Sequence, residues 1–187
     1  MSALPGIDIT RLAVPVTKRD HIRGRFDAAA TLLEYGDYEC PVCGQARFLV
    51  EALRHALGSG MRFVFRNFPL TNIHPHAEHA AEAAEAAGAE GKFWEMHDTL
   101  LANQMALEDE DLARYAAELG LDLERFINEL LEGKYAKRVR EDFRSGVRSG
   151  VNGTPTFFVN DWRYDGPRDP ESMAAALLET AARTAPQ

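Results

Sequence analysis

The sequence predicts an α/β fold in which short strands from both ends of the chain form a sheet and a long helical segment separates them. Short apolar runs bounded by turn residues at 31–35, 61–67 and 156–160 are typical of buried strands. Helical character extends through nearly all of 74–149, with an alanine-rich stretch at 77–87. The first two strands flank a helix, which predicts a parallel pair because such crossovers are right-handed.

The helix between the first two strands is expected at 41–57. Its apolar residues recur at intervals of three and four, and Gly58 ends the pattern. Pro41 falls in the first turn, where backbone amides have no intrahelical acceptor in any case. Before the first strand, residues 1–24 read as an arm laid on the domain, with a short strand at 12–16.

The helical segment divides into expected helices at 77–87, 91–104, 109–119, 122–131 and 134–148, with glycines at the breaks. A turn cluster at 150–155 leads into the third strand, and Asn160 with Asp161 can turn the chain into a hairpin arm at 162–164. A helix at 170–182 ends the chain. The expected organisation is an arm at 1–24, the first half of the sheet domain at 25–70, the helical insertion at 71–150 and the second half at 151–187.

The composition is that of one soluble, folded domain. The chain has 187 residues, 45% of them hydrophobic and 27% charged. Its net charge of -8 disfavours nucleic acid as a partner. It has no apolar run of about 18 residues, so we expect no membrane insertion. The N-terminal residues lack the regions of a secretory signal, so we expect a cytoplasmic protein, although a chain whose leader had been removed would read the same.

Both cysteines of the chain lie in one motif, CPVC at 40–43. Such a pair can be a redox dithiol, half of a zinc site or two ordinary thiols. Cys40 is expected at the end of a strand and the start of a helix, where unpaired amides and the helix dipole stabilise a thiolate, the form that attacks disulfides. Cys43, one turn further on the same face, can close the ring. This position favours redox chemistry, with Cys40 as the nucleophile and Cys43 as the resolving cysteine.

A zinc site would need two more ligands. His74, His76 and His79 are the only rich source of them. We favour the interpretation that these histidines are exposed near a helix start or contact the rest of the domain. The sequence therefore predicts no metal.

The stretch TLLEYGDYECPVC at 31–43, with GTPTFFV at 153–159 and helices between them, resembles the DsbA-like thiol-disulfide oxidoreductases of the thioredoxin superfamily. The resemblance extends to the C-terminal helix and covers most of the chain. It implies a thioredoxin-like fold with an all-helical domain inserted between the second and third core strands. It also implies exchange with protein thiols and disulfides, without a cofactor, and leaves the redox partner unknown.

The resemblance assigns roles to further residues. Pro155 would be a cis proline beside the active cysteines, and Thr154 would offer backbone groups to a substrate chain. Pro41 and Val42 complete the expected substrate-binding residues. Glu34 is a carboxylate inside an apolar strand, where burial suits a group to proton transfer. The family places at this point an acid that accepts the proton of the resolving thiol; a satisfied core carboxylate, or one pointing out at the sheet edge, is the alternative.

The dipeptide between the cysteines departs from the best-known members. It is Pro-Val, neither the Pro-His of strongly oxidising members nor the Gly-Pro of thioredoxins. No imidazolium is available inside the motif, and Asp37 and Glu39 are expected to oppose a thiolate. We therefore expect a redox potential between about -270 mV for thioredoxin and about -120 mV for DsbA, which leaves the direction of exchange open.

Two other functions stay open at this point. The first is a glutathione-dependent transferase or isomerase on a related fold, which would not need Cys43. The second is a binding module whose cysteine pair holds zinc.

Overall fold

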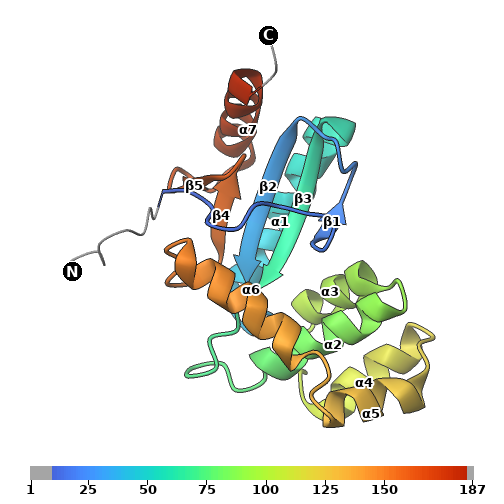
Figure 1. The fold of residues 1–187 in the computed structure, drawn as a ribbon. Coiled ribbons are helices and arrows are strands. Elements are labelled where there is room, and N and C mark those ends of the chain that lie inside the picture. Colours follow the sequence, from blue (N-terminus) through green and yellow to red (C-terminus); the bar gives the residue numbers. More distant parts are fainter. Residues whose placement is uncertain (1–9, 185–187) are drawn as a thin grey trace. The chain divides into compact units, whose positions relative to one another are not determined.

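The computed structural model describes residues 10–184, which form a five-stranded sheet and seven α-helices (Figure 1). The strands are β1 (His21–Arg23), β2 (Ala30–Gly36), β3 (Met61–Asn67), β4 (Thr156–Val159) and β5 (Trp162–Tyr164). The helices are α1 (Pro41–Leu57), α2 (Ala77–Ala89), α3 (Phe93–Ala102), α4 (Asp109–Glu118), α5 (Leu123–Leu131), α6 (Ala136–Arg148) and α7 (Pro170–Thr184). Part of the expected arm, residues 1–9, lies outside the described residues.

The chain divides into two compact units. The first, made of Met1–Tyr35, Gln45–Arg66 and Arg144–Gln187, contains the sheet, most of α1, and α7. The second, made of Gly36–Gly44 and Asn67–Phe143, contains α2 to α5, the first part of α6 and the segment that carries both cysteines. The domain boundaries expected at residues 24, 70 and 150 stay a prediction.

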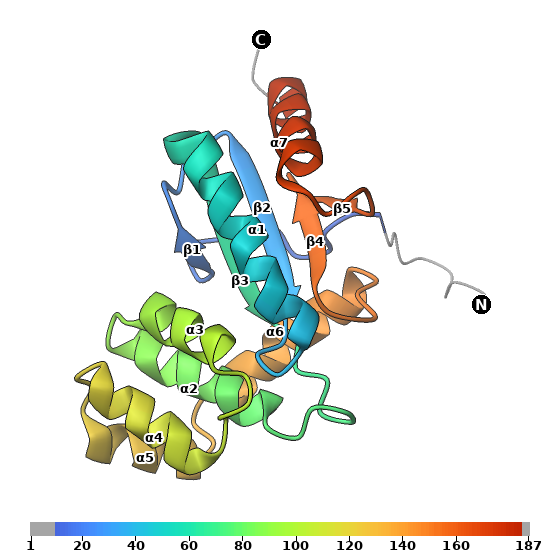
Figure 2. The ribbon, with the colours of Figure 1, turned by 180° about the vertical axis from the view of Figure 1, so that it is seen from behind.

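The sheet has the strand order β1-β3-β2-β4-β5. In Figure 1, β2 and β3 point the same way, as expected for two strands joined through a helix. β4 runs antiparallel to β2, with Glu34 opposite Phe157, and β5 runs antiparallel to β4. α1 lies along one face of the sheet (Figure 2). The α/β class and the helical insertion between the second and third core strands are confirmed.

The turn between β4 and β5 has the sequence that its geometry requires. Asn160 and Asp161 both have positive φ angles, 46° and 71°, a conformation that Asn and Asp adopt more readily than most residues. The Asn160 side chain also accepts a hydrogen bond from the amide of Thr31, at 2.6 Å, and donates to Thr180 of α7. The turn therefore connects the sheet with the C-terminal helix.

The expectation of a strand at 12–16 is wrong. The N-terminal strand, β1, lies instead at His21–Arg23 and pairs antiparallel with β3. Pro15 has no amide hydrogen for a strand ladder, and its carbonyl oxygen accepts a hydrogen bond from Arg66 rather than from a neighbouring strand. In Figure 1 the segment before β1 crosses the sheet on the face opposite α1.

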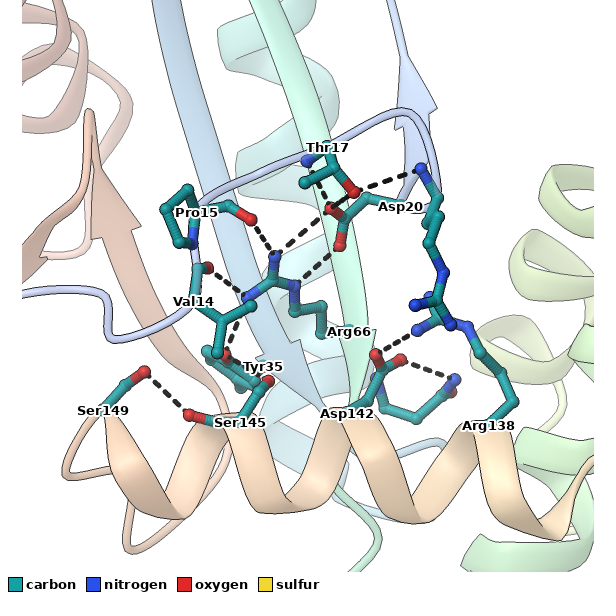
Figure 3. Close-up of polar contacts among 12 residues, drawn as sticks. Val14, Pro15, Thr17, Asp20, Tyr35, Arg66, Arg138, Asp142, Ser145 and Ser149 are labelled. Carbon is teal, nitrogen blue, oxygen red and sulfur yellow. Dashed lines mark hydrogen bonds and ion pairs between the residues drawn. The ribbon is translucent and has the colours of Figure 1, made fainter.

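Arg66 of β3 holds this N-terminal segment against the sheet (Figure 3). Its guanidinium donates to the carbonyl oxygens of Val14 and Pro15 and forms an ion pair with Asp20 at 2.7 Å. It also donates to the hydroxyl of Tyr35 at 3.0 Å. Burial opposes the charge of Arg66, but the bonds with Asp20 and Tyr35 outweigh it and raise the arginine pKa above its usual value. The side chains of Arg66 and Asp20 are only 3% and 6% exposed, so each charge depends on the other.

Removing the carboxylate of this pair should strongly destabilise the sheet. Asp20→Ala is expected to lower the free energy of unfolding by about 3–5 kcal/mol, because Arg66 would stay buried without its counter-charge. Urea unfolding followed by circular dichroism measures the loss. Asp27→Ala, which removes the exposed partner of Arg25, is the matched control and should leave the unfolding midpoint unchanged. A loss for Asp20→Ala no larger than that of the control would contradict the assignment.

Candidate active site

The two cysteines lie at the start of α1. The helix begins at Pro41, and the amide of Gly44 donates to the carbonyl oxygen of Cys40 at 3.1 Å. This is the first hydrogen bond of the helix, so Cys40 is its N-cap residue and Cys43 lies in the first turn. Both cysteines are thiols, with exposures of 6% for Cys40 and 0% for Cys43. The more exposed of the two residues is thus the one expected to attack.

The helix start offers favourable surroundings for negative charge on sulfur. No acidic residue occupies the first turn of α1. The backbone amide of Asp37 points at the sulfur of Cys43, with a nitrogen-to-sulfur distance of 3.5 Å. Amides with no intrahelical partner and the positive end of the helix dipole both stabilise a thiolate.

The side chain of Asp37, which is expected from the sequence to oppose the thiolate, has hydrogen-bond partners at both carboxylate oxygens. One carboxylate oxygen accepts a hydrogen bond from the amide of Glu39 at 2.8 Å. The other accepts from the amide of Leu70 and contacts the Nδ1 atom of His74, both at 2.8 Å. The carboxylate is fully buried, and these three partners replace part of the hydration that it loses. That its charge opposes the Cys40 thiolate stays a prediction.

Glu39, the second carboxylate expected to oppose the thiolate, also has a donor. It accepts a hydrogen bond from the backbone amide of His76 at 2.8 Å. Of the histidines considered as zinc ligands, His74 contacts Asp37, and Nδ1 of His79 lies 2.9 Å from the exposed carboxylate of Asp109. Among residues 10–184, no three or more His, Cys, Asp or Glu side chains are grouped so that they could hold a metal ion.

Two side chains that the sequence did not assign to the site, His97 and Gln104, contact the segment before Cys40. The Tyr38 hydroxyl lies 3.0 Å from Nδ1 of His97, and both residues are buried. The side-chain amide of Gln104, in the loop between α3 and α4, donates to the carbonyl oxygens of Tyr38 and Cys40 at 2.8 and 2.7 Å. No motif marks either residue, because the contacts join positions about 60 residues apart.

The remaining expected site residues are found in both units. Pro41 and Val42 are exposed at the start of α1, Val42 by 47%. Glu34, in the first unit, is 2% exposed on the central strand β2, so the alternative in which it points out at the sheet edge is wrong. Thr154 and Pro155 also belong to the first unit, and the peptide bond between them is cis. The roles of these residues stay predictions.

A family model described as thioredoxin matches residues 16–179. Among the curated relatives is a Na(+)/H(+) antiporter NhaA 3 of Salinispora tropica, 48% identical over 93% of this chain. The match covers 27% of that protein, so the chain spans about a quarter of the length of the curated relatives it matches. Those relatives thus contain a region of this family within a longer chain. Within residues 10–184, no helix has both the length and the apolar character to cross a membrane.

Solved structures share the fold over nearly the whole chain. BdbD from Bacillus subtilis superposes with a TM-score of 0.80 at 22% identity, covering 92% of this chain and 98% of its own. A thioredoxin-like oxidoreductase from Silicibacter pomeroyi gives 0.79 at 27% identity, covering 90% and 95%. Wolbachia pipientis alpha-DsbA1 gives 0.75 at 18% identity, covering 92% and 96%.

These matches include both parts of the chain that form the sheet and the helices between them. The thioredoxin-like fold expected from the sequence is therefore confirmed. The chain belongs to the thioredoxin family, and it shares its fold, including the helical insertion, with BdbD and alpha-DsbA1.

Proposed function

We propose that the chain is a thiol-disulfide oxidoreductase that acts on protein thiols and disulfides through Cys40 and Cys43. The observation that carries this function is the placement of two thiols at the N-cap and first turn of α1 in a chain of the thioredoxin family. The 27% identical oxidoreductase from Silicibacter pomeroyi, which has the same fold, supports it. The names of the curated relatives describe much longer proteins and do not enter this assignment.

The exchange takes two steps, written here for reduction of a substrate. The Cys40 thiolate attacks a substrate disulfide, which forms a mixed disulfide and releases one substrate sulfur as a thiolate. The Cys43 thiolate then attacks the Cys40 sulfur, which forms the Cys40–Cys43 disulfide and releases the second substrate sulfur. Two electrons pass from the protein dithiol to the substrate. Oxidation of a substrate dithiol is the same sequence in reverse.

The two thiols also separate this function from a glutathione-dependent transferase. One-cysteine chemistry would not need a second sulfur, and this chain has both cysteines of the motif, which supports the dithiol function. For the substrate we propose an extended protein segment that contacts the exposed side chains of Pro41 and Val42 and the backbone at Thr154 and Pro155.

The decisive test separates the two sulfurs by role. Cys43→Ser should accumulate mixed disulfides with substrate proteins, visible on non-reducing gels, because the resolving thiol is gone. Cys40→Ser should form few adducts and be inactive in insulin reduction. After reduction of the unchanged protein, Cys40 should react with iodoacetamide faster than the buried Cys43. Equal adduct formation by the two variants would overturn the assignment of attacker and resolver.

Glu34 can be tested as the proton acceptor of the resolving step. Glu34→Gln keeps the shape of the side chain but removes its basicity, so resolution should slow by about 10²-fold while Cys40 alkylation changes little. Rapid-quench kinetics of the mixed disulfide with a model disulfide measure the step. Glu51→Gln, on the exposed side of α1, is the control. An unchanged lifetime of the mixed disulfide in Glu34→Gln would exclude this role.

The dipeptide between the cysteines should influence the redox potential. Val42→His places an imidazole beside the thiolate, which stabilises the reduced form and makes the protein more oxidising. A stabilisation of about 1.4 kcal/mol would raise the potential by about 30 mV. Equilibration with glutathione buffers gives the potential. A more reducing variant would show that the interior of the motif acts by another route.

A further inference from the structure

The loop between α3 and α4 reaches the cysteine motif through one side chain. The Nε2 atom of Gln104 lies 2.8 Å from the carbonyl oxygen of Tyr38 and 2.7 Å from that of Cys40. A primary amide nitrogen carries two hydrogens, so a single Gln104 side chain can donate to both carbonyls at once. One donor group thereby fixes the peptide group that precedes Glu39 and the peptide group that follows Cys40.

The bond to Cys40 acts at the first turn of α1. The Cys40 carbonyl oxygen also accepts the first helical hydrogen bond, from Gly44 at 3.1 Å, and its two lone pairs allow both bonds. An N-cap residue has a conformation different from that of the helix that follows. Gln104 therefore holds the peptide group that sets this conformation and, with it, the direction in which the Cys40 side chain leaves the backbone.

Gly44 makes room for this amide. A Cβ atom built on Gly44 would overlap the Oε1 atom of Gln104 and lie only 2.7 Å from its Cδ atom. Gly44 is not among the glycines with positive φ, so its backbone conformation is open to other residues. Glycine is unfavourable within a helix relative to alanine. The close approach of Gln104 is the structural reason for a glycine directly after Cys43.

We propose that Gln104 and Gly44 form a positioning pair for the attacking cysteine. Gln104 keeps Cys40 in the N-cap conformation, in which the first-turn amides stabilise its thiolate, and Gly44 admits the Gln104 side chain. Neither residue reacts with substrate. The pair deepens the proposed function, on which it rests, by naming residues that set the reactivity of Cys40.

The test measures Cys40 alone, in a Cys43→Ser background, by its rate of alkylation with iodoacetamide against pH. Gln104→Ala should slow alkylation at neutral pH by about fivefold, the equivalent of one lost hydrogen bond, and move the midpoint of the profile to higher pH. Asp37 and Glu39 lie in the segment before Cys40, and His74 and His97 contact that segment. These ionisable groups are unchanged in every variant.

Gly44→Ala is a second, independent substitution that should remove the hydrogen bonds of Gln104 to the cysteine motif. The new methyl group should push the Gln104 amide away, so this variant should show the same slowing and the same shift. Combining it with Gln104→Ala should add nothing further, because the amide is already absent. Asn103→Ala is the matched control: it removes an amide of the same loop that donates only to Thr99, and it should leave the profile unchanged.

The outcomes distinguish a failure of the positioning pair from a failure of the proposed function. Additive effects of the two substitutions, or an unshifted profile in Gln104→Ala with native circular dichroism, would overturn the positioning pair. If Gln104→Ala fails to fold, Gly44→Ala alone gives the test, and a profile identical to that of the unchanged protein would overturn the pair. Absence of insulin reduction by the unchanged protein would instead overturn the proposed function.

Discussion

A buried carboxylate, that of Asp37, connects the two loops that meet at the start of α1. A carboxylate taken out of water is costly unless donors replace its hydration. Asp37 finds them in its own loop, at the amide of Glu39, and in the segment after β3, at the amide of Leu70 and the ring of His74. With the side chain fixed in this way, the backbone amide of the same residue is held toward Cys43. The surroundings of the cysteines therefore depend on one residue that itself has no sulfur chemistry.

The helical unit supplies side chains that contact the segment around Cys40, the proposed nucleophile. His97 comes from α3, and Gln104 from the loop that follows it. The segment between β3 and α2 adds the contacts of His74 and His76. The segment that carries the cysteines belongs to the same compact unit as these helices. Substitutions in the insertion can therefore change the chemistry of Cys40 without contacting substrate.

Local patterns in the sequence predicted the elements of the fold well. Apolar runs located β2, β3 and β4, and the three-and-four spacing located α1 to its last residue. The strand in the arm was wrongly predicted because a few apolar residues around Pro15 look like a strand. In the structure, buried Arg66 donates hydrogen bonds to the carbonyl oxygens of that segment. Propensity describes what a segment prefers on its own. It does not reveal an arginine about 50 residues away.

The site could be predicted only in part for the same reason. The order of strand, turn and helix correctly placed Cys40 and Cys43 at a helix start from the sequence alone, while their roles stay predictions. The hydrogen-bond donors to the carboxylates beside them, among them the backbone amides of Leu70 and His76, could not be predicted because they leave no trace in composition or spacing. Gly44 has a clear structural reason only once the position of Gln104 is known. Residues that support a site are harder to find than residues that react.

The redox character of such a site depends on how strongly the protein stabilises the thiolate. Here the interior of the motif contributes no charge, and the nearby carboxylates of Asp37 and Glu39 each accept hydrogen bonds from within the protein. The helix start remains, and a helix dipole contributes about 0.3–1 kcal/mol at exposed termini and up to about 2 kcal/mol when partly buried. Since about 1.4 kcal/mol corresponds to 30 mV, this amounts to tens of millivolts. The gap between thioredoxin and DsbA is about 150 mV. A helix start without an added imidazolium therefore accounts for only part of that gap, which is the physical basis for expecting an intermediate potential in this protein.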